Sequence, residues 1–139
     1  MRHGYCLIKE TGQEQNKITR WTRSGCFCFY VSAEKKNWTE SRDDCKRRNS
    51  TLAIINKPPK QDFVSKLERF GESWIGLMGV KGWKYEWKWV DESPMQHHGW
   101  KTNVNAFPGV ESKAFIDLQG HWDHAQNGSK HWICEKLIC

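Results

Sequence analysis

Histidines are concentrated in the second half of the sequence, where their imidazole rings offer ligands for a transition metal. His97 and His98 are adjacent, and the segment His121-Trp-Asp-His124 adds two more. A zinc site usually takes three or four ligands at fixed geometry, which adjacent histidines in an irregular segment do not supply. Histidines in such a segment are generally solvated or contact a partner molecule. The sequence therefore predicts no metal site.

Nucleophilic and acid–base catalysis also lack a suitable arrangement of residues. No serine or cysteine stands in a recognisable nucleophile elbow. The carboxylate pairs Asp43-Asp44 and Asp91-Glu92 fall in a predicted helix and a predicted turn, where solvated charge is the ordinary explanation. We therefore expect a binding protein with no cofactor, and no enzyme.

Cysteines form the third group of reactive side chains, and their spacing favours disulfides. Zinc sites usually contain two close Cys pairs, whereas here only Cys26 and Cys28 are close together. An even number of cysteines in a Trp-rich domain indicates an extracellular or luminal compartment. The sequons at Asn37, Asn49 and Asn127 predict N-glycosylation and support the same compartment. The six cysteines are Cys6, Cys26, Cys28, Cys45, Cys134 and Cys139.

The length and composition of the chain predict one compact domain. The chain has 139 residues, of which 37% are hydrophobic, and its nine Trp exclude intrinsic disorder. No apolar run is long enough to span a bilayer and no signal-peptide pattern is present, so we expect membrane attachment only through a segment outside this sequence. The net charge is +6, but Lys and Arg are spread along the chain without a nucleic-acid-binding module. We expect acidic partners and no nucleic acid.

Two helices are predicted in the first half of the chain. Asn37 is a good N-cap, and Glu40 stands where its carboxylate can reach back to the cap, so a helix should run to about Arg48. A second helix should begin at Pro58 and end at Gly71. The faces that these helices would bury carry Trp38, Ser41 and Cys45 in the first and Phe63, Leu67 and Phe70 in the second.

Short strands are predicted around the helices, which gives an α+β domain. Residues 95–110 are rich in Pro, Gly, Asn and His without a period, and a loop of this length in a compact domain is usually functional. Residues 1–20 are polar and unpatterned, and we interpret them as a stalk or leader segment before a domain at 21–139. The predicted strands are 26–31, 51–55, 73–77, 83–89, 114–118 and 131–134.

Several ordered motifs support a more specific interpretation. They are Trp38 and Cys45 in the first helix, Trp74-Ile-Gly-Leu77, Trp87-Lys-Trp89-Val-Asp91 and Trp132-Ile-Cys134. Together they resemble the C-type lectin-like domain over residues 21–139. The segments 26–31 and 37–41 are similar to the branch of natural-killer-cell receptors and their lectin-like ligands, and 109–116 to ligands related to osteoclast inhibitory lectin. The resemblance implies two helices, two small antiparallel sheets and a long loop region.

The resemblance also implies a disulfide between Cys45 and Cys134. The family's second core disulfide would need cysteines near Lys113 and Gln126, and neither is present. We expect the other four cysteines to form two bridges, one of them tying the stalk to Cys28. Their three possible pairings stay open, and a stalk cysteine could instead join two chains.

Sugar-binding members of this family chelate calcium with a Glu-Pro-Asn type triplet in the long loop and a Trp-Asn-Asp triplet near the end. By position these triplets fall on Asn103-Val-Asn105 and Trp122-Asp123-His124. The first has lost its Glu and Pro, and the second has His in place of its terminal Asp. Calcium requires six to eight oxygen ligands, so we expect recognition without calcium.

For this branch, the resemblance implies a protein partner on an immune-cell surface, either a natural-killer-type receptor of the same fold or a class I histocompatibility-like protein. Residues 83–107 and 119–128 would form the contact face. We further expect a homodimer and an extracellular location, as a secreted protein or as the ectodomain of a type II membrane protein. The alternative is a glycan-binding lectin with a degenerate calcium site. The predicted contact residues are Lys84, Tyr85, Glu86, Met95, His97, His98, Trp100, Lys101, Asn105, Phe107, His121 and His124.

Tryptophans need a separate assignment, because a large indole can serve the core or a contact surface. Trp100 fits either role equally well. The remaining indoles of the family motifs are expected in the core, namely Trp38, Trp74, Trp87, Trp89 and Trp132.

Overall fold

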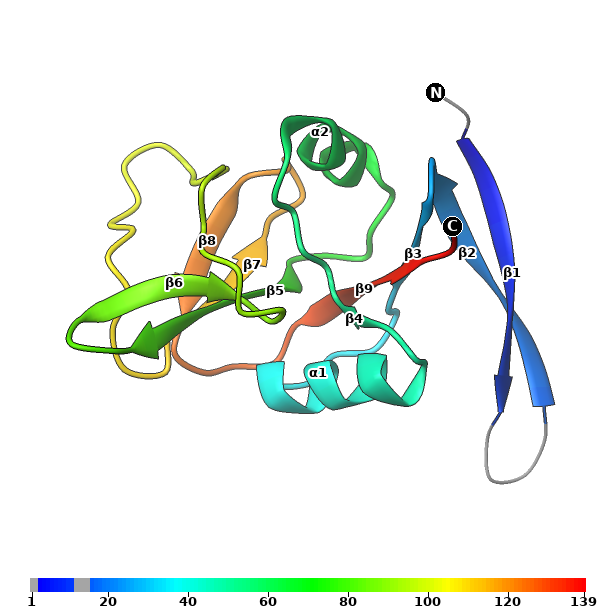
Figure 1. The fold of residues 1–139 in the computed structure, drawn as a ribbon, viewed down its shortest axis with the longest axis horizontal. Coiled ribbons are helices and arrows are strands. Elements are labelled where there is room, and N and C mark those ends of the chain that lie inside the picture. The colour runs from blue at the N-terminus through cyan, green and yellow to red at the C-terminus, as the bar shows by residue number, and fades with distance from the viewer. Residues whose placement is uncertain (1–2, 12–15) are drawn as a thin grey trace.

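The computed structural model describes residues 3–11 and 16–139. Over these residues two helices cover opposite sides of a twisted set of strands (Figure 1), which confirms the predicted α+β class. Neither helix is long and apolar enough to cross a membrane. The elements are β1 (His3–Thr11), β2 (Asn16–Ser24), β3 (Phe27–Val31), α1 (Trp38–Arg47), β4 (Thr51–Leu52), α2 (Pro58–Lys66), β5 (Ser73–Lys81), β6 (Tyr85–Trp89), β7 (Lys113–Ile116), β8 (Trp122–Ala125) and β9 (His131–Leu137).

The strands form two antiparallel groups that meet at the centre of the molecule. The order along the sheet is β1-β2-β3-β9-β5-β7-β8, with β4 paired to β9 and β6 paired to β5. The two groups join where Ser73 and Trp74 of β5 run parallel to His131 and Trp132 of β9. The two small sheets implied by the family resemblance are thus connected through this short parallel contact.

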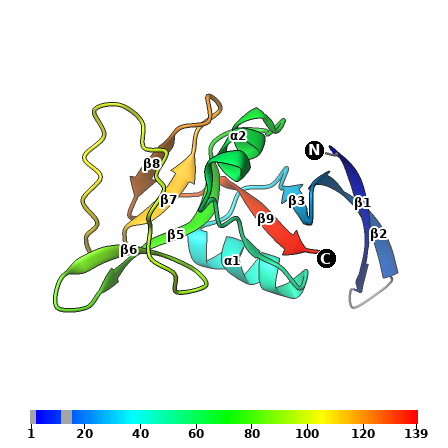
Figure 2. The ribbon, with the colours of Figure 1, turned by 45° about the horizontal axis from the view of Figure 1, so that its top comes forward.

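The N-terminal segment differs most from the sequence-based interpretation. Residues 1–20 were expected to be an unpatterned stalk, but β1 and β2 form an antiparallel hairpin that continues onto β3. The expected boundary between residues 20 and 21 therefore falls inside β2, while residues 1–2 and 12–15 lie outside the described part of the chain. Figures 1 and 2 show this hairpin at one end of the molecule.

Helix α1 begins with the predicted capping box. The side-chain oxygen of Asn37 accepts a hydrogen bond from the backbone N of Glu40 at 2.8 Å, and the Glu40 carboxylate accepts from the backbone N of Asn37 at 3.4 Å. Helix α2 begins at Pro58 as expected but ends at Lys66, before the predicted Gly71. The backbone turns extended at Leu67, so Phe70 leaves the buried stripe and is 64% exposed.

The core consists of two adjoining clusters. One includes Val64 of α2 together with Trp89 and Trp122; the other includes Trp38 of α1 together with Trp132. All five tryptophans expected in the core are buried. The motifs are spread along the chain because the buried indoles come from α1 and from strands that include β5, β6, β8 and β9.

Three disulfides join α1, β1 and the C-terminal residue to the rest of the domain. The structure joins Cys45 to Cys134, the pair that the family resemblance implies. Cys6 of β1 is bonded to Cys28 of β3, and Cys26 is bonded to Cys139 at the end of the chain. All six cysteines are therefore paired within one chain, and none is left to join two chains.

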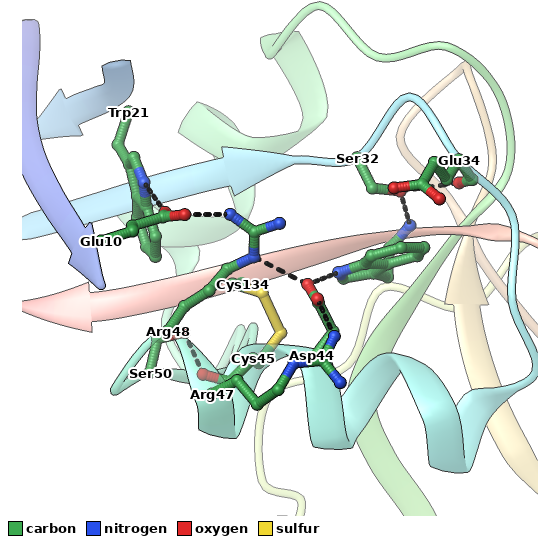
Figure 3. Close-up of polar contacts among 11 residues, drawn as sticks. Glu10, Trp21, Ser32, Glu34, Asp44, Cys45, Arg47, Arg48, Ser50 and Cys134 are labelled. Carbon is green, nitrogen blue, oxygen red and sulfur yellow. Dashed lines mark hydrogen bonds and ion pairs between the residues drawn. A yellow bond between two sulfur atoms is a disulfide. The ribbon is translucent and has the colours of Figure 1, made fainter. Parts of the chain in front are cut away.

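An ion-pair network holds the hairpin against α1 (Figure 3). The Arg48 guanidinium donates to Asp44 at 2.7 Å and to Glu10 of β1 at 2.6 Å. The indole N–H of Trp132 donates to the same Asp44 carboxylate at 3.1 Å, and that of Trp21 donates to Glu10 at 3.3 Å. Arg48 and Asp44 thus connect Glu10 of the hairpin to Trp132 in the core, while the Trp21 bond holds Glu10 within the hairpin itself.

Candidate functional site

The long loop, residues 90–112, runs from β6 to β7 without a helix or strand of its own. It lies at the end of the molecule opposite the hairpin (Figure 1). Its backbone pairs briefly with β8, because the Trp122 N donates to the Gly99 oxygen at 2.7 Å and the Lys101 N donates to the Trp122 oxygen at 2.8 Å. The loop expected at 95–110 is therefore present, longer by a few residues at each end, and it is attached to an edge of the sheet.

Aromatic rings form the base on which the loop rests. The Trp100 ring lies 4.9 Å from the Trp87 ring and 5.5 Å from the Trp122 ring, between ring centroids. Trp89 packs edge-on against Trp122 at 5.5 Å. Trp100, which the sequence left open, is half-buried against the core and is part of this base. Its indole N–H has no hydrogen-bond partner among the described residues.

The predicted contact residues divide into an exposed set and a half-buried set. Phe107 stands out in the exposed set, with 84% of its surface accessible. The half-buried residues form the inner side of the loop or the strands beneath it: Tyr85, Met95, His97, Trp100 and His124. The exposed residues are Lys84, Glu86, His98, Lys101, Asn105, Phe107 and His121.

His97 faces inward, although its neighbour His98 is exposed. The His97 ring lies edge-on to Trp122 with 6.0 Å between centroids, and its Nε2 is buried without a partner in the described part of the chain. Burial, together with the nearby His98, lowers the pKa of His97 below its ordinary value. A neutral His97 therefore serves the base of the loop, and His98 is the member of the pair that faces solvent.

His121 lies apart from the loop and belongs to the turn between β7 and β8. That turn is held against α2 and its C-terminal extension, because the Gln61 amide donates to the Gly120 oxygen and the Arg69 guanidinium donates to the Asp117 oxygen, each at 2.8 Å. The Asp117 carboxylate accepts from the backbone N of His121 at 2.9 Å. The structure thus groups His121 with α2, whereas Lys84, Tyr85 and Glu86 lie on the β5–β6 hairpin.

Trp83 is an exposed residue that the list of predicted contacts omitted. Its alternation with Tyr85, Trp87 and Trp89 predicted one aromatic strand face, but β6 begins only at Tyr85. Trp83 instead occupies the tip of the β5–β6 turn, where it is 90% exposed and lies 5.0 Å from the Lys84 ammonium. The adjacent Gly82 was the available signal, because glycine commonly marks a tight turn.

At the positions of the calcium triplets, side-chain oxygens accept hydrogen bonds from nearby backbone groups. The Asp123 carboxylate accepts from the backbone N of His124 at 2.7 Å, and the Asn105 side-chain oxygen accepts from the backbone N of Phe107 at 3.2 Å. His124 Nε2 lies 2.5 Å from the Asn105 carbonyl oxygen. A carbonyl only accepts, so this nitrogen carries a proton and is not free to bind a metal. Within residues 3–11 and 16–139, no three His, Cys, Asp or Glu side chains are grouped to hold one.

The three sequons are exposed at their asparagines. Asn37 is the N-cap of α1, and Asn49 follows the same helix with a left-handed backbone (φ 54°). Asn127 lies between β8 and β9. Exposure is compatible with modification at all three, and N-glycosylation stays a prediction.

Comparison with known proteins gives a consistent result. The family model described as the lectin C-type domain matches residues 34–136. Mouse asialoglycoprotein receptor 2 is 32% identical over 127 residues, covering 84% of this chain and 40% of that protein. Human killer cell lectin-like receptor subfamily G member 1 is 29% identical over 117 residues, covering 84% of this chain and 56% of that protein.

A solved structure shows the same architecture. The carbohydrate-recognition domain of the mouse scavenger receptor C-type lectin superimposes with a TM-score of 0.75 at 31% sequence identity, covering 86% of this chain and 94% of that one. The chain thus corresponds to nearly all of this solved domain, but to only 40% and 56% of the two receptors.

Proposed function

Because the chain belongs to the C-type lectin domain family, we propose that it is a calcium-independent protein-recognition domain of immune recognition. Its partner would be a natural-killer-type lectin-like receptor or a class I histocompatibility-like protein, bound through the long loop and the β5–β6 turn. Domains of this family are typically non-enzymatic binding domains. We also propose an extracellular setting, in a type II membrane protein or a secreted one, and a homodimer.

The observation that carries the proposal is the exposure of two large aromatic side chains at this end of the molecule. Trp83 is 90% exposed and Phe107 is 84% exposed, whereas seven of the nine tryptophans are buried. Aromatic residues dominate the binding energy of many protein interfaces, and exposed apolar groups of this size favour a partner that covers them.

Charge around these aromatics favours an acidic partner. Lys81, Lys84 and Lys101 are exposed, and Lys88 is half-buried on β6, while Glu86 is the acidic residue among them on the hairpin. Complementary charge mainly accelerates association and selects among partners. Human killer cell lectin-like receptor subfamily G member 1 is a relative from the natural-killer branch, which supports a partner from immune recognition.

Binding assays with single substitutions test the proposed face. We would immobilise the chain and measure binding of purified ectodomains of natural-killer lectin-like receptors and of class I histocompatibility proteins. Trp83→Ala and Phe107→Ala should each weaken binding about tenfold or more, because aromatic anchors typically contribute 1–2 kcal/mol or more. Phe70→Ala is the matched control, since Phe70 is an exposed aromatic beyond α2. Equal losses in all three variants would contradict the assignment of the face.

Glycan binding is the second candidate, supported by the carbohydrate-recognition domain of the mouse scavenger receptor C-type lectin as a structural relative. The exposed Trp83 ring with the Lys84 ammonium 5.0 Å away offers a surface on which a sugar could stack. A glycan array read with and without EDTA separates the two candidates. A binding signal that persists in EDTA and is lost in Trp83→Ala would favour glycan binding. The absence of any binding signal would favour a protein partner.

A further inference from the structure

Two side chains of the sheet and one from the residue after β8 donate hydrogen bonds to three carbonyl oxygens of the long loop. The Trp87 indole N–H donates to Ala106 at 2.6 Å. His124 Nε2 donates to Asn105 at 2.5 Å, and the Gln126 amide donates to Val110 at 3.1 Å. We call Trp87, His124 and Gln126 the clasp. It connects β6, β8 and the residue after β8 to one continuous stretch of the loop.

The central member of the clasp is fixed by packing as well as by its hydrogen bond. The His124 ring lies edge-on to Trp87 with 5.4 Å between centroids, and edge-on to Trp100 with 5.8 Å. The two indoles restrict the ring to the orientation in which Nε2 reaches the Asn105 oxygen. Trp87 lies on β6 and Trp100 in the loop, so the ring packs against both the sheet and the loop, which its hydrogen bond joins.

The hydrogen bonds of the clasp lie at two places where the family resemblance implies other links: the calcium triplets and the second core disulfide. His124 stands at the last position of the second calcium triplet, and Asn105 stands at the last position of the first. Gln126 lies where one cysteine of the absent second disulfide would be, and its partner Val110 lies three residues before Lys113, near the other. One direct hydrogen bond thus joins the two triplet positions, and another joins the two segments near which the second disulfide would lie.

We propose that the clasp fixes the long loop without calcium, and that His124 is its principal positioning residue. The loop backbone between Asn105 and Val110 carries the exposed Phe107, so the clasp also sets the position of that side chain. The value of this arrangement for binding rests on the proposed function, because a prepared loop loses less entropy when a partner docks. The inference about the loop itself needs no partner.

Hydrogen–deuterium exchange of the whole chain, read by mass spectrometry, tests the clasp. His124→Phe keeps a ring against Trp87 and Trp100 but removes the donor. Exchange of residues 99–112 should become about fivefold faster, since a net hydrogen bond contributes about 1 kcal/mol. His121→Phe is the matched control and should leave these amides unchanged, because the His121 side chain lies on the turn beside α2. Wild-type exchange should be the same in calcium and in EDTA.

Two results would overturn the proposal: slower exchange of residues 99–112 in calcium than in EDTA, or unchanged exchange in His124→Phe. Residues 38–47 of α1 report on global unfolding. If their exchange also rises in His124→Phe, Gln126→Met replaces it as the test, because it removes an exposed donor while keeping a side chain of similar length. Failure to find a protein partner would leave these exchange rates unchanged. The experiment therefore tests the clasp independently of the proposed function.

Discussion

The hairpin end and the long-loop end of the molecule are held by different kinds of interaction. At the hairpin end, two disulfides join β1 and the C-terminal residue to the segment around β3, and Arg48 bridges Asp44 and Glu10. At the long-loop end the sequence has no cysteine between Cys45 and Cys134, and the loop is held by hydrogen bonds to its carbonyls and by aromatic packing. Covalent and ionic restraint is thus concentrated away from the exposed aromatics of the proposed face.

This difference indicates that the residues that stabilise the fold and the residues that bind a partner lie at different ends of the molecule. Interactions at the hairpin end and in the centre should contribute mainly to the free energy of unfolding. Exposed residues at the loop end should contribute mainly to binding, since substitutions of exposed side chains usually change stability by less than about 0.5 kcal/mol. Substitutions at the two ends should therefore fall into two classes, and a variant that falls into the wrong class would break the comparison.

Removal of the Cys45–Cys134 disulfide, whose two cysteines are fully buried, should lower stability more than removal of the Cys6–Cys28 disulfide. The bonded cysteines are 89 residues apart in sequence, and closing a loop of that length contributes on the order of 4 kcal/mol. Cys45→Ala combined with Cys134→Ala should lower the free energy of unfolding by about that amount in urea titration. The control is Cys6→Ala combined with Cys28→Ala, whose separation is 22, and whose cost should be about 3 kcal/mol. A larger cost for the control would contradict the role of loop length.

A buried ion pair near the hairpin end should give the next largest effect. The Lys60 ammonium lies 2.9 Å from the Glu135 carboxylate, which also accepts from the backbone N of Ile54 at 2.8 Å, and the two side chains are only 10% and 9% exposed. Lys60→Met leaves the carboxylate buried without its cation, which should cost about 3 kcal/mol at neutral pH.

The pH dependence of that variant has a defined sign. Burial raises the pKa of Glu135 although Lys60 opposes the shift, so Lys60→Met should raise this pKa further. A carboxyl whose pKa is higher in the folded state binds more protons there, so stability falls as pH rises from the unfolded pKa through the folded one. The cost of Lys60→Met should therefore be smallest below the pKa of the unfolded Glu side chain and grow toward neutral pH. Urea titrations across this range check the slope, and a cost independent of pH would contradict it.

Arg48 should give a smaller loss that sharpens the comparison, because it joins the hairpin to α1. Its side chain is 18% exposed, and Arg48→Met keeps the packing of the chain while removing the bonds to Asp44 and Glu10. The cost should be about 2 kcal/mol, since two carboxylates lose a charged partner. Arg47→Met is the matched control: Arg47 also pairs with Asp44 but is 68% exposed, so its loss should stay below about 1 kcal/mol. Thermal unfolding of both variants provides the measurement.

The sequence predicted the centre of the fold well because each pattern there, such as a helix cap or a buried indole, depends on residues within a single element. Asn37 and Glu40 form the predicted capping box, and the buried indoles of the family motifs pack where expected. The β1–β2 hairpin was missed because its strands alternate weakly. Cys6 is buried while Tyr5 and Leu7, at 62% and 71% exposed, are apolar on the outward face, so both faces look mixed in sequence.

Around the loop, sequence predicted which segment is irregular but not how it is held. His124 was expected to be an exposed contact, whereas its ring packs edge-on against Trp87 of β6 and Trp100 of the long loop. No local pattern reports such a contact, because Asn105 and His124 meet only through the three-dimensional course of the loop. For Trp83 the local pattern itself was misleading. Its alternation with Tyr85 predicted a strand, but the turn at Gly82 ends the pairing before Trp83 enters it.

His98 provides the smallest expected effect on stability and the sharpest test of the loop end. It is exposed, whereas the adjacent His97 packs against Trp122. His98→Ala should therefore change the free energy of unfolding by less than about 0.5 kcal/mol, yet weaken partner binding by about fivefold if the proposed face is correct. His97→Ala is the matched control, and it should lower the melting temperature because it removes a ring from the base of the loop. If His98→Ala lowered binding and melting temperature together, the loop end would share the structural role of the hairpin end, and the separation between the two regions would be wrong.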